Sequence, residues 1–180
     1  DPALNAAREA IDLVLRGHEP YPALAVDRHW NLVAHNRAVP PLLAGVSAEL
    51  LVPPINVMHL SLHPQGLAPR ILNLAQWRGH AFARLRQQIA ASADPQLEAL
   101  LASLQRYPAP AHDAAPIDAA MVVPLQIDSP AGVLSLFGTT TVFGTPVDVT
   151  LSELALETFF PADAATATAL RALFEGHATA

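Results

Sequence analysis

Residues 123–143 read Val123-Pro-Leu-Gln-Ile-Asp128, then Ser129-Pro-Ala-Gly132, then Val133-Leu-Ser-Leu-Phe-Gly-Thr-Thr-Thr-Val-Phe143. In the first segment, apolar side chains alternate with polar residues or proline, which is the two-residue period of a half-buried strand. The last segment is rich in β-branched and aromatic residues, which favour strands. The four residues between them contain the proline and glycine of a turn. This stretch therefore predicts two antiparallel strands joined by a short turn.

Further apolar runs lie upstream and downstream of this hairpin. Ala23-Leu-Ala-Val26 and Asn31-Leu-Val-Ala34 are separated by Asp27-Arg-His-Trp30, which indicates a second hairpin. Residues 149–160 fit either helical or strand spacing. We interpret them as a strand whose alternation slips at Ser152-Glu153, as it does at a β-bulge. The sequence thus predicts five strands.

Helical spacing fills the remaining segments. A short helix is expected from Ala3 to Leu15, stopping at Gly17, and the longest helix is expected to run from Leu67 to Asp94-Pro95. Short polar side chains suited to helix N-caps stand at Asn36, Asp94 and Asp163.

Long helical connections between two groups of strands favour a single α+β fold. We expect a PAS-like five-stranded antiparallel sheet with helices packed on one face. Residues 1–18 are expected to form an N-terminal linker helix, and residues 19–180 the PAS-like domain.

Composition limits the classes of function. The 180 residues are 52% hydrophobic, and the ten basic residues, all Arg, are outnumbered by sixteen acidic ones. A dispersed set of cations with net charge −6 argues against a nucleic-acid surface in this chain. The absence of Cys excludes thiol catalysis and disulfides. With no signal peptide and no apolar run long enough for a membrane span, we expect a cytoplasmic protein without membrane contact.

Few side chains suggest catalysis or metal binding. His59 and His63 have helical i, i+4 spacing, and His80 or Glu49 could supply a third metal ligand, but Pro64 and the lack of a His-Glu-x-x-His pattern favour a structural role. No nucleophile motif is present, and we expect neither a metal nor another cofactor. Glu153 and Glu157 are interpreted as a solvated face of their strand rather than as a catalytic carboxylate pair.

Several segments resemble the ligand-binding domain of MmyB-like transcription regulators. The likeness covers residues 19–163, and the run Leu62-His-Pro-Gln-Gly-Leu-Ala-Pro-Arg70 is its most specific part. His59 and Gln76 depart from the Arg and Glu of the family pattern. The other similar segments are Glu19-Pro-Tyr-Pro-Ala23, Asp27-Arg-His-Trp-Asn-Leu32, Ala34-His-Asn36, Ile71-Leu-Asn-Leu-Ala-Gln-Trp77, Arg84-Leu-Arg86, Tyr107-Pro108, Gly132-Val-Leu-Ser-Leu136 and Phe160-Pro-Ala-Asp163.

The resemblance implies a PAS-like sensor domain that binds a fatty-acid-like molecule and follows an Xre-type helix-turn-helix DNA-binding domain. This chain contains no such DNA-binding segment, so DNA would be bound only by a domain outside it. The resemblance also implies a regulator rather than an enzyme.

A ligand cavity is expected between the helices and the sheet. Arg70, placed in the first turn of the longest predicted helix, gains nothing from the helix dipole and is expected to bind an acidic partner or a ligand carboxylate, with His59 and His63 as alternatives. The aromatic side chain of Trp30 is a further residue that could line the cavity. The expected cavity walls are Met58, Leu62, Leu74, Trp77, Phe82, Leu136 and Phe143.

Two other hypotheses stay open at this point. A small hydrolase or lyase would need a third polar side chain converging on His59 and His63. A structural dimerisation module would have a filled core, and a homodimer is compatible with either regulator or module. An apolar cavity with one or two polar groups would favour the sensor.

Overall fold

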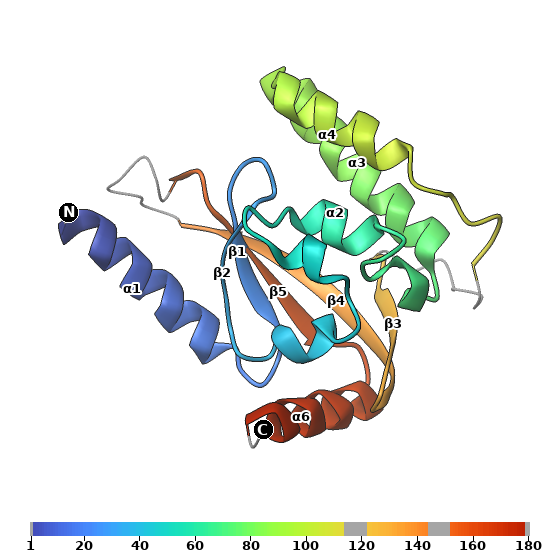
Figure 1. The fold of residues 1–180 in the computed structure, drawn as a ribbon. Coiled ribbons are helices and arrows are strands. Elements are labelled where there is room, and N and C mark those ends of the chain that lie inside the picture. Colours follow the sequence, from blue (N-terminus) through green and yellow to red (C-terminus); the bar gives the residue numbers. More distant parts are fainter. Residues whose placement is uncertain (1, 114–121, 144–151, 179–180) are drawn as a thin grey trace.

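A computed structural model of the chain describes residues 2–113, 122–143 and 152–178 (Figure 1). Its five strands form one sheet in the order β2-β1-β5-β4-β3, and every neighbouring pair is antiparallel. This confirms the predicted α+β fold with a PAS-like sheet. The strands are β1 (Ala23–Val26), β2 (Leu32–His35), β3 (Leu125–Ser129), β4 (Gly132–Val142) and β5 (Ala155–Pro161).

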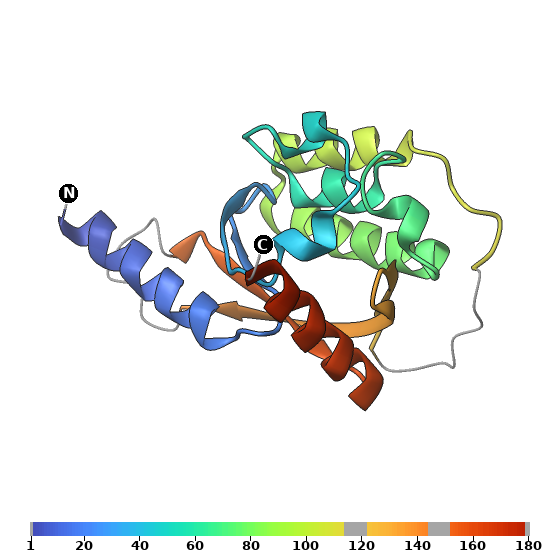
Figure 2. The same cartoon turned by 60° about the horizontal axis from the view of Figure 1, so that its bottom comes forward.

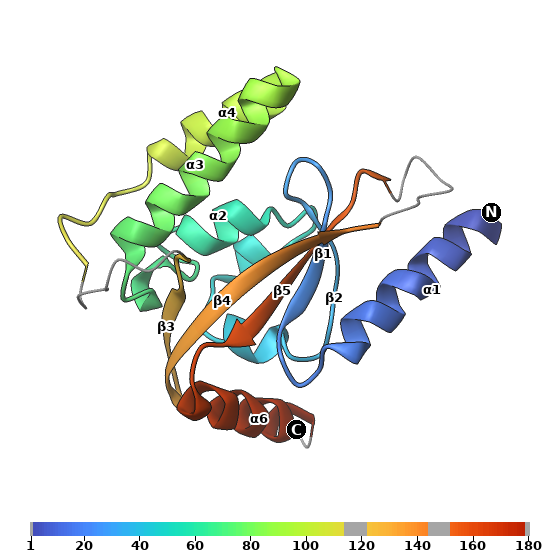
Figure 3. The ribbon, with the colours of Figure 1, turned by 180° about the vertical axis from the view of Figure 1, so that it is seen from behind.

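Helices cover one face of this sheet as a separate layer. Helix α2 (Val57–Leu62) crosses in front of the strands in Figure 1 and behind them in Figure 3, so it lies on a single face. Helices α3 (Leu74–Ser92) and α4 (Pro95–Gln105) pack side by side in the same layer, above the sheet in Figure 2. Short 3-10 helices complete it: η1 (Pro40–Leu43), η2 (Ala48–Leu51) and η3 (Ala68–Arg70).

The side chains of β1 show how the sheet divides the molecule. Leu24 and Val26 face the layer of α2, α3 and α4. Ala23 and Ala25, which alternate with them, are buried on the other face against the first helix, α1 (Pro2–Gly17). The sheet therefore lies between α1 on one face and the α2–α4 layer on the other.

The last helix, α6 (Ala164–Ala178), closes one end of the sheet. Its buried Ala169 and Leu170 pack with Leu134 and Leu136 of β4. Asp163 begins the helix as predicted, because its side chain accepts a hydrogen bond from the Thr166 N–H at 2.7 Å. Asp94 likewise caps α4 by accepting from the Gln96 N–H at 2.9 Å.

The longest helix begins later than the sequence predicts. The segment from Leu67 to Asn73 is not helical throughout: η3 ends at Arg70, Ile71 forms a bridge to Ile127 of β3, and α3 starts only at Leu74. The Asn73 side chain holds this arrangement by donating to the Pro124 carbonyl at 2.7 Å and accepting from the Gln126 N–H at 3.0 Å. Pairing with β3 thus replaces the first turns of the predicted helix.

Two smaller predictions also change. Asn36 caps no helix, because η1 begins at Pro40; its buried side chain instead bonds the Ala23 N–H and the Leu15 and Tyr21 carbonyls. The strand predicted over residues 149–160 starts at Ala155, and residues 149–151 lie outside the described residues.

Candidate functional site

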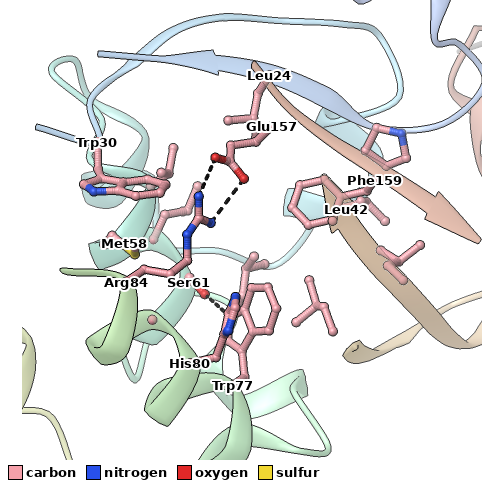
Figure 4. Close-up of a pocket in the computed structure, with 18 of the residues that line it drawn as sticks. Leu24, Trp30, Leu42, Met58, Ser61, Trp77, His80, Arg84, Glu157 and Phe159 are labelled. Carbon is pink, nitrogen blue, oxygen red and sulfur yellow. Dashed lines mark hydrogen bonds and ion pairs between the residues drawn. The ribbon is translucent and has the colours of Figure 1, made fainter. Parts of the chain in front are cut away.

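A cavity of about 390 Å³ lies between the sheet and helices α2 and α3 (Figure 4). Its wall is apolar over most of its extent, with polar side chains at a few positions only. The apolar lining residues are Pro22, Leu24, Trp30, Val39, Leu42, Leu43, Val57, Met58, Leu60, Leu67, Trp77, Ala81, Val122, Val123, Leu125, Leu136, Gly138 and Phe159. The polar ones are Ser61, His80, Arg84, Thr140 and Glu157.

Local backbone features aim several of these side chains at the cavity. Asn56 caps α2 by accepting hydrogen bonds from the Met58 and His59 N–H groups, which places Met58 on the inner side of the helix. Trp30 has a left-handed φ of 69° in the β1–β2 turn, and its indole N–H donates to the Gln88 Oε1 at 2.7 Å. The Trp77 indole N–H donates to the Ser61 Oγ at 2.8 Å, which fixes its ring against α2.

The structure brings only part of the predicted cavity wall together. Trp30, Met58, Trp77 and Leu136 line the cavity. The other four predicted wall residues lie elsewhere. Leu62 and Phe82 are buried in the α2–α4 core. Leu74 packs against that core and against the cluster of Ile127 and Leu134, without reaching the cavity. Phe143 is at the opposite face of the sheet, packed with the cluster that docks α1.

None of the predicted ligand donors lines the cavity. The Arg70 guanidinium donates to the Leu42 carbonyl of η1. It thus links η3 to η1 and does not line the cavity. The interpretation that Arg70 belongs to the longest helix is wrong for the reason given above, because η3 is a separate turn.

His59 and His63 turn toward α4, away from the cavity. The His59 Nδ1 lies 2.5 Å from the Tyr107 hydroxyl and its Nε2 lies 3.3 Å from the Ser103 Oγ. The Ser103 hydroxyl donates to the Leu100 carbonyl at 2.7 Å, so its oxygen is left to accept from the His59 N–H. Burial lowers the pKa of His59, and the neighbouring His63 lowers it further. Both effects favour a neutral ring, which donates from Nε2 to Ser103 and accepts at Nδ1 from Tyr107. The His59 ring therefore ties α2 to α4.

A buried ion pair occupies the centre of the cavity wall. The Arg84 guanidinium donates to both oxygens of Glu157, with Nη2–Oε1 at 2.8 Å and Nη1–Oε2 at 3.2 Å. The Thr140 hydroxyl joins them, accepting from Arg84 at 2.9 Å and donating to the Glu157 Oε1 at 3.0 Å. The Glu157 side chain is 8% exposed and that of Arg84 is 29% exposed. The expectation that Glu157 lies on a solvated face is wrong; Glu153 is exposed, as that interpretation required.

The register of the sheet explains why Glu157 points inward. Glu157 of β5 is paired with Leu24 of β1 on one side and with Thr140 of β4 on the other, so the three side chains form a row across the cavity face. Phe159, two residues along β5, continues on the same face. Arg84 reaches this row from α3, and its guanidinium carbon lies 4.5 Å from the centre of the Trp30 ring.

His80 lies one helical turn before Arg84 on the same face of α3. Its ring is 5.6 Å from that of Trp77, and no hydrogen bond joins it to another described residue. Burial lowers the pKa of His80, with a further decrease from the Arg84 charge that Glu157 partly offsets. We call His80, Arg84, Thr140 and Glu157 the polar strip; Figure 4 shows its three labelled members between Trp30 on one side and Leu42 and Phe159 on the other.

The sequence does not predict the polar strip, because Arg84 and Glu157, which form its ion pair, are 73 residues apart. Two signals point to it in retrospect. Glu157 is in strand alternation with the apolar Phe159, and Arg84 is part of the Arg84-Leu-Arg86 segment that carries the family resemblance.

Two kinds of feature are absent from the described ranges, a metal-binding cluster and a membrane-spanning helix. No group of three His, Cys, Asp or Glu side chains in them is placed to hold a metal ion. None of the helices in these ranges combines the length and the hydropathy needed to cross a bilayer.

Comparison with known families matches residues 7–173 to the MmyB-like transcription regulator ligand binding domain. The chain belongs to this family. As an MmyB-like ligand-binding domain, it is a ligand-sensing domain of a transcription regulator, and the cavity described above is the candidate site for its ligand. Comparison with curated individual proteins finds no match.

Proposed function

We propose that this domain binds a fatty-acid-like molecule, meaning an unbranched alkyl chain with one polar end, in the cavity between α2, α3 and the sheet. It acts within a cytoplasmic regulator whose helix-turn-helix domain binds DNA, with residues 1–18 as the linker helix. The observation that carries the proposal is an apolar cavity of about 390 Å³ with a short polar strip. Small-molecule sites typically enclose about 300–1,000 Å³ with a few placed polar groups.

The composition of the lining suits an alkyl chain. Aliphatic and aromatic side chains from β1, η1, α2 and α3 surround the space, while the polar side chains are those of the strip and Ser61. Each buried methylene contributes about 0.8 kcal/mol, so a cavity of this composition binds alkyl groups with little need for directional contacts.

The two competing hypotheses are less well supported. A structural module is expected to have a filled core, and the apolar cavity of about 390 Å³ does not agree with that expectation. For a hydrolase or lyase, Tyr107 and Ser103 do converge on His59. These side chains lie outside the cavity, however, and the Ser103 hydroxyl donates its proton to the Leu100 carbonyl instead of to the imidazole.

Titration with alkyl compounds of increasing length tests the proposal. The chain has two tryptophans, and because both line the cavity their fluorescence reports its occupation. For n-alkan-1-ols from hexanol to dodecanol, we expect affinity to rise by about fourfold per methylene until the cavity is full. Affinity that is flat along the series, or no fluorescence change with any member, would contradict the proposal.

A variant pair on α3 separates binding in the cavity from binding elsewhere. Ala81 lines the cavity and is buried, whereas Ala83 of the same helix is exposed. Ala81→Leu should fill the space and weaken binding of the longest alkanols, and Ala83→Leu should bind as the wild type does. Leu42→Trp at a half-buried lining position provides a second blocking variant if Ala81→Leu unfolds.

A further inference from the structure

The charges of the polar strip already balance without a ligand. Arg84 contributes one positive charge and Glu157 one negative charge, and each of the two oxygens of Glu157 accepts from the guanidinium. His80 is held toward its neutral form by burial. The strip therefore offers a ligand hydrogen-bonding groups and no net charge.

An ionised carboxylate fits this environment poorly. It would bring a second negative charge beside Glu157, whose side chain is 8% exposed. If it took the place of Glu157 on Arg84, Glu157 would be buried without its cation and would keep only the hydrogen bond from Thr140. The Trp30 ring, 4.5 Å from the guanidinium carbon, also restricts where Arg84 can move.

An uncharged oxygen meets no such penalty. The His80 ring lines the cavity without a hydrogen bond to another described residue, and a neutral imidazole can donate or accept. The Ser61 oxygen accepts from the Trp77 indole N–H, so the Ser61 hydroxyl proton points away from that ring. We infer that the cavity selects an amphiphile with an uncharged, oxygen-containing head group, such as a long-chain alcohol or ester, over the carboxylate of the same chain length, with His80 as the head-group partner.

This inference rests on the proposed function, and its test compares head groups at one chain length. Tryptophan fluorescence titrations at pH 7.5 with decan-1-ol, methyl decanoate and sodium decanoate keep the alkyl part similar. We expect both uncharged compounds to bind at least about tenfold more tightly than decanoate, because burying an unpaired carboxylate is costly. Decanoate binding as tightly as decan-1-ol would overturn the inference while leaving the proposed function intact. Absence of binding by all three would overturn both.

Charge variants test the physical cause. Glu157→Gln retains the shape of the side chain and leaves Arg84 with an uncompensated charge, so decanoate should gain affinity relative to decan-1-ol. The double variant Arg84→Met/Glu157→Gln is again uncharged, and in it the preference for decan-1-ol should return. An unchanged ratio of the two affinities in Glu157→Gln, with circular dichroism showing a folded protein, would refute the charge argument.

Substitutions of His80 test the head-group partner. His80→Leu should weaken decan-1-ol by roughly two- to twelvefold, the range expected for one hydrogen bond, and His80→Gln should retain most of the affinity. His177→Leu, at an exposed position of α6, is the matched control and should bind as the wild type does. Equal affinities of His80→Leu and the wild type for decan-1-ol would remove His80 from the assignment.

Discussion

At the residue scale, we expect the Arg84–Glu157 pair to affect both stability and ligand binding. Arg84→Met leaves a carboxylate that is 8% exposed without its cation. We expect the free energy of unfolding to fall by about 3 kcal/mol, the lower end of the range for breaking a buried pair, because the Arg84 side chain keeps some contact with water. Urea unfolding measures the change.

The exposed pair Arg28–Glu153 provides the control for that substitution. Its nitrogen and oxygen are 3.3 Å apart, and the two side chains are 60% and 47% exposed. Arg28→Met should therefore cost less than about 1 kcal/mol. Equal losses from the two substitutions would show that the buried pair has no special weight.

Two histidines predict how stability changes with pH. Burial lowers the pKa of both His59 and His80 from 6.5 in the folded chain. The unfolded chain therefore binds more protons as the pH falls below about 6.5, and the stability of the fold decreases. We expect the melting temperature to be lower at pH 5.5 than at pH 7.5.

Carboxylates do not account for that change, because those with lowered pKa values, Glu19, Asp94 and Asp163, titrate below about pH 4.5. His59→Gln should reduce the difference in melting temperature between pH 7.5 and pH 5.5, and His177→Gln should not. A melting temperature independent of pH over this interval would rule out buried neutral histidines as its source.

Residue roles that depend on near neighbours can be predicted from the sequence, and those that depend on distant partners cannot. Asp94 and Asp163 bond backbone groups two and three residues away, and both were predicted as caps. Glu157 was assigned to solvent because the cation that allows its burial is 73 residues away. Arg70 is predicted to bind an acidic side chain or a ligand carboxylate, but its acceptor is the carbonyl of Leu42.

At the scale of elements, Gly66 fixes how α2 is followed by η3. A Cβ at this position would lie 2.3 Å from the Leu60 carbonyl oxygen, the group that accepts the Leu67 N–H at 2.9 Å. Gly66→Ala must therefore move backbone, and we expect a loss of about 1–3 kcal/mol in the free energy of unfolding, as for other overpacked sites.

Gly79 offers the opposite case on the exposed side of α3. Nothing lies within 4 Å of a Cβ built there, so Gly79→Ala should stabilise the protein by about 1 kcal/mol through helix propensity. Chemical denaturation of the two variants should give changes of opposite sign. A neutral Gly66→Ala would mean that the α2–η3 junction relaxes freely.

Element boundaries show where periodicity misleads. The hairpins and the helix after Asp94 follow patterns contained within each segment, and they were predicted correctly. The helical spacing of Leu67, Ile71 and Leu74 continues through a segment that is not one helix, because Ile71 pairs with Ile127 of β3. Both conformations bury Ile71, so apolar spacing alone cannot distinguish them.

At the scale of the whole molecule, the sheet connects the cavity to α1. Leu24 and Glu157 face the cavity, while Ala25 and Leu156 face Ile11 and Leu15 of α1 across the same strands. A ligand that favours one arrangement of β1 and β5 therefore acts on the docking site of α1 with no intervening layer. The ligand can shift that arrangement only by its differential affinity for the two states.

This geometry predicts a reciprocal coupling between α1 and the ligand. Ile11 is buried against the sheet, and Ile11→Ala should loosen α1, whereas Leu13 is 69% exposed, so Leu13→Ala should have no effect. If ligand binding and α1 docking are linked, weakening the docking must change ligand affinity by the same factor that the ligand changes docking. We expect Ile11→Ala to alter the affinity for decan-1-ol by at least about fivefold, the lower bound of typical allosteric coupling.

Hydrogen exchange gives the converse measurement, because saturating decan-1-ol should slow exchange in α1 of the wild type by a comparable factor. Unchanged affinity in Ile11→Ala together with unchanged exchange in α1 would show that the cavity and α1 are energetically independent, and that the signal leaves the domain by another surface.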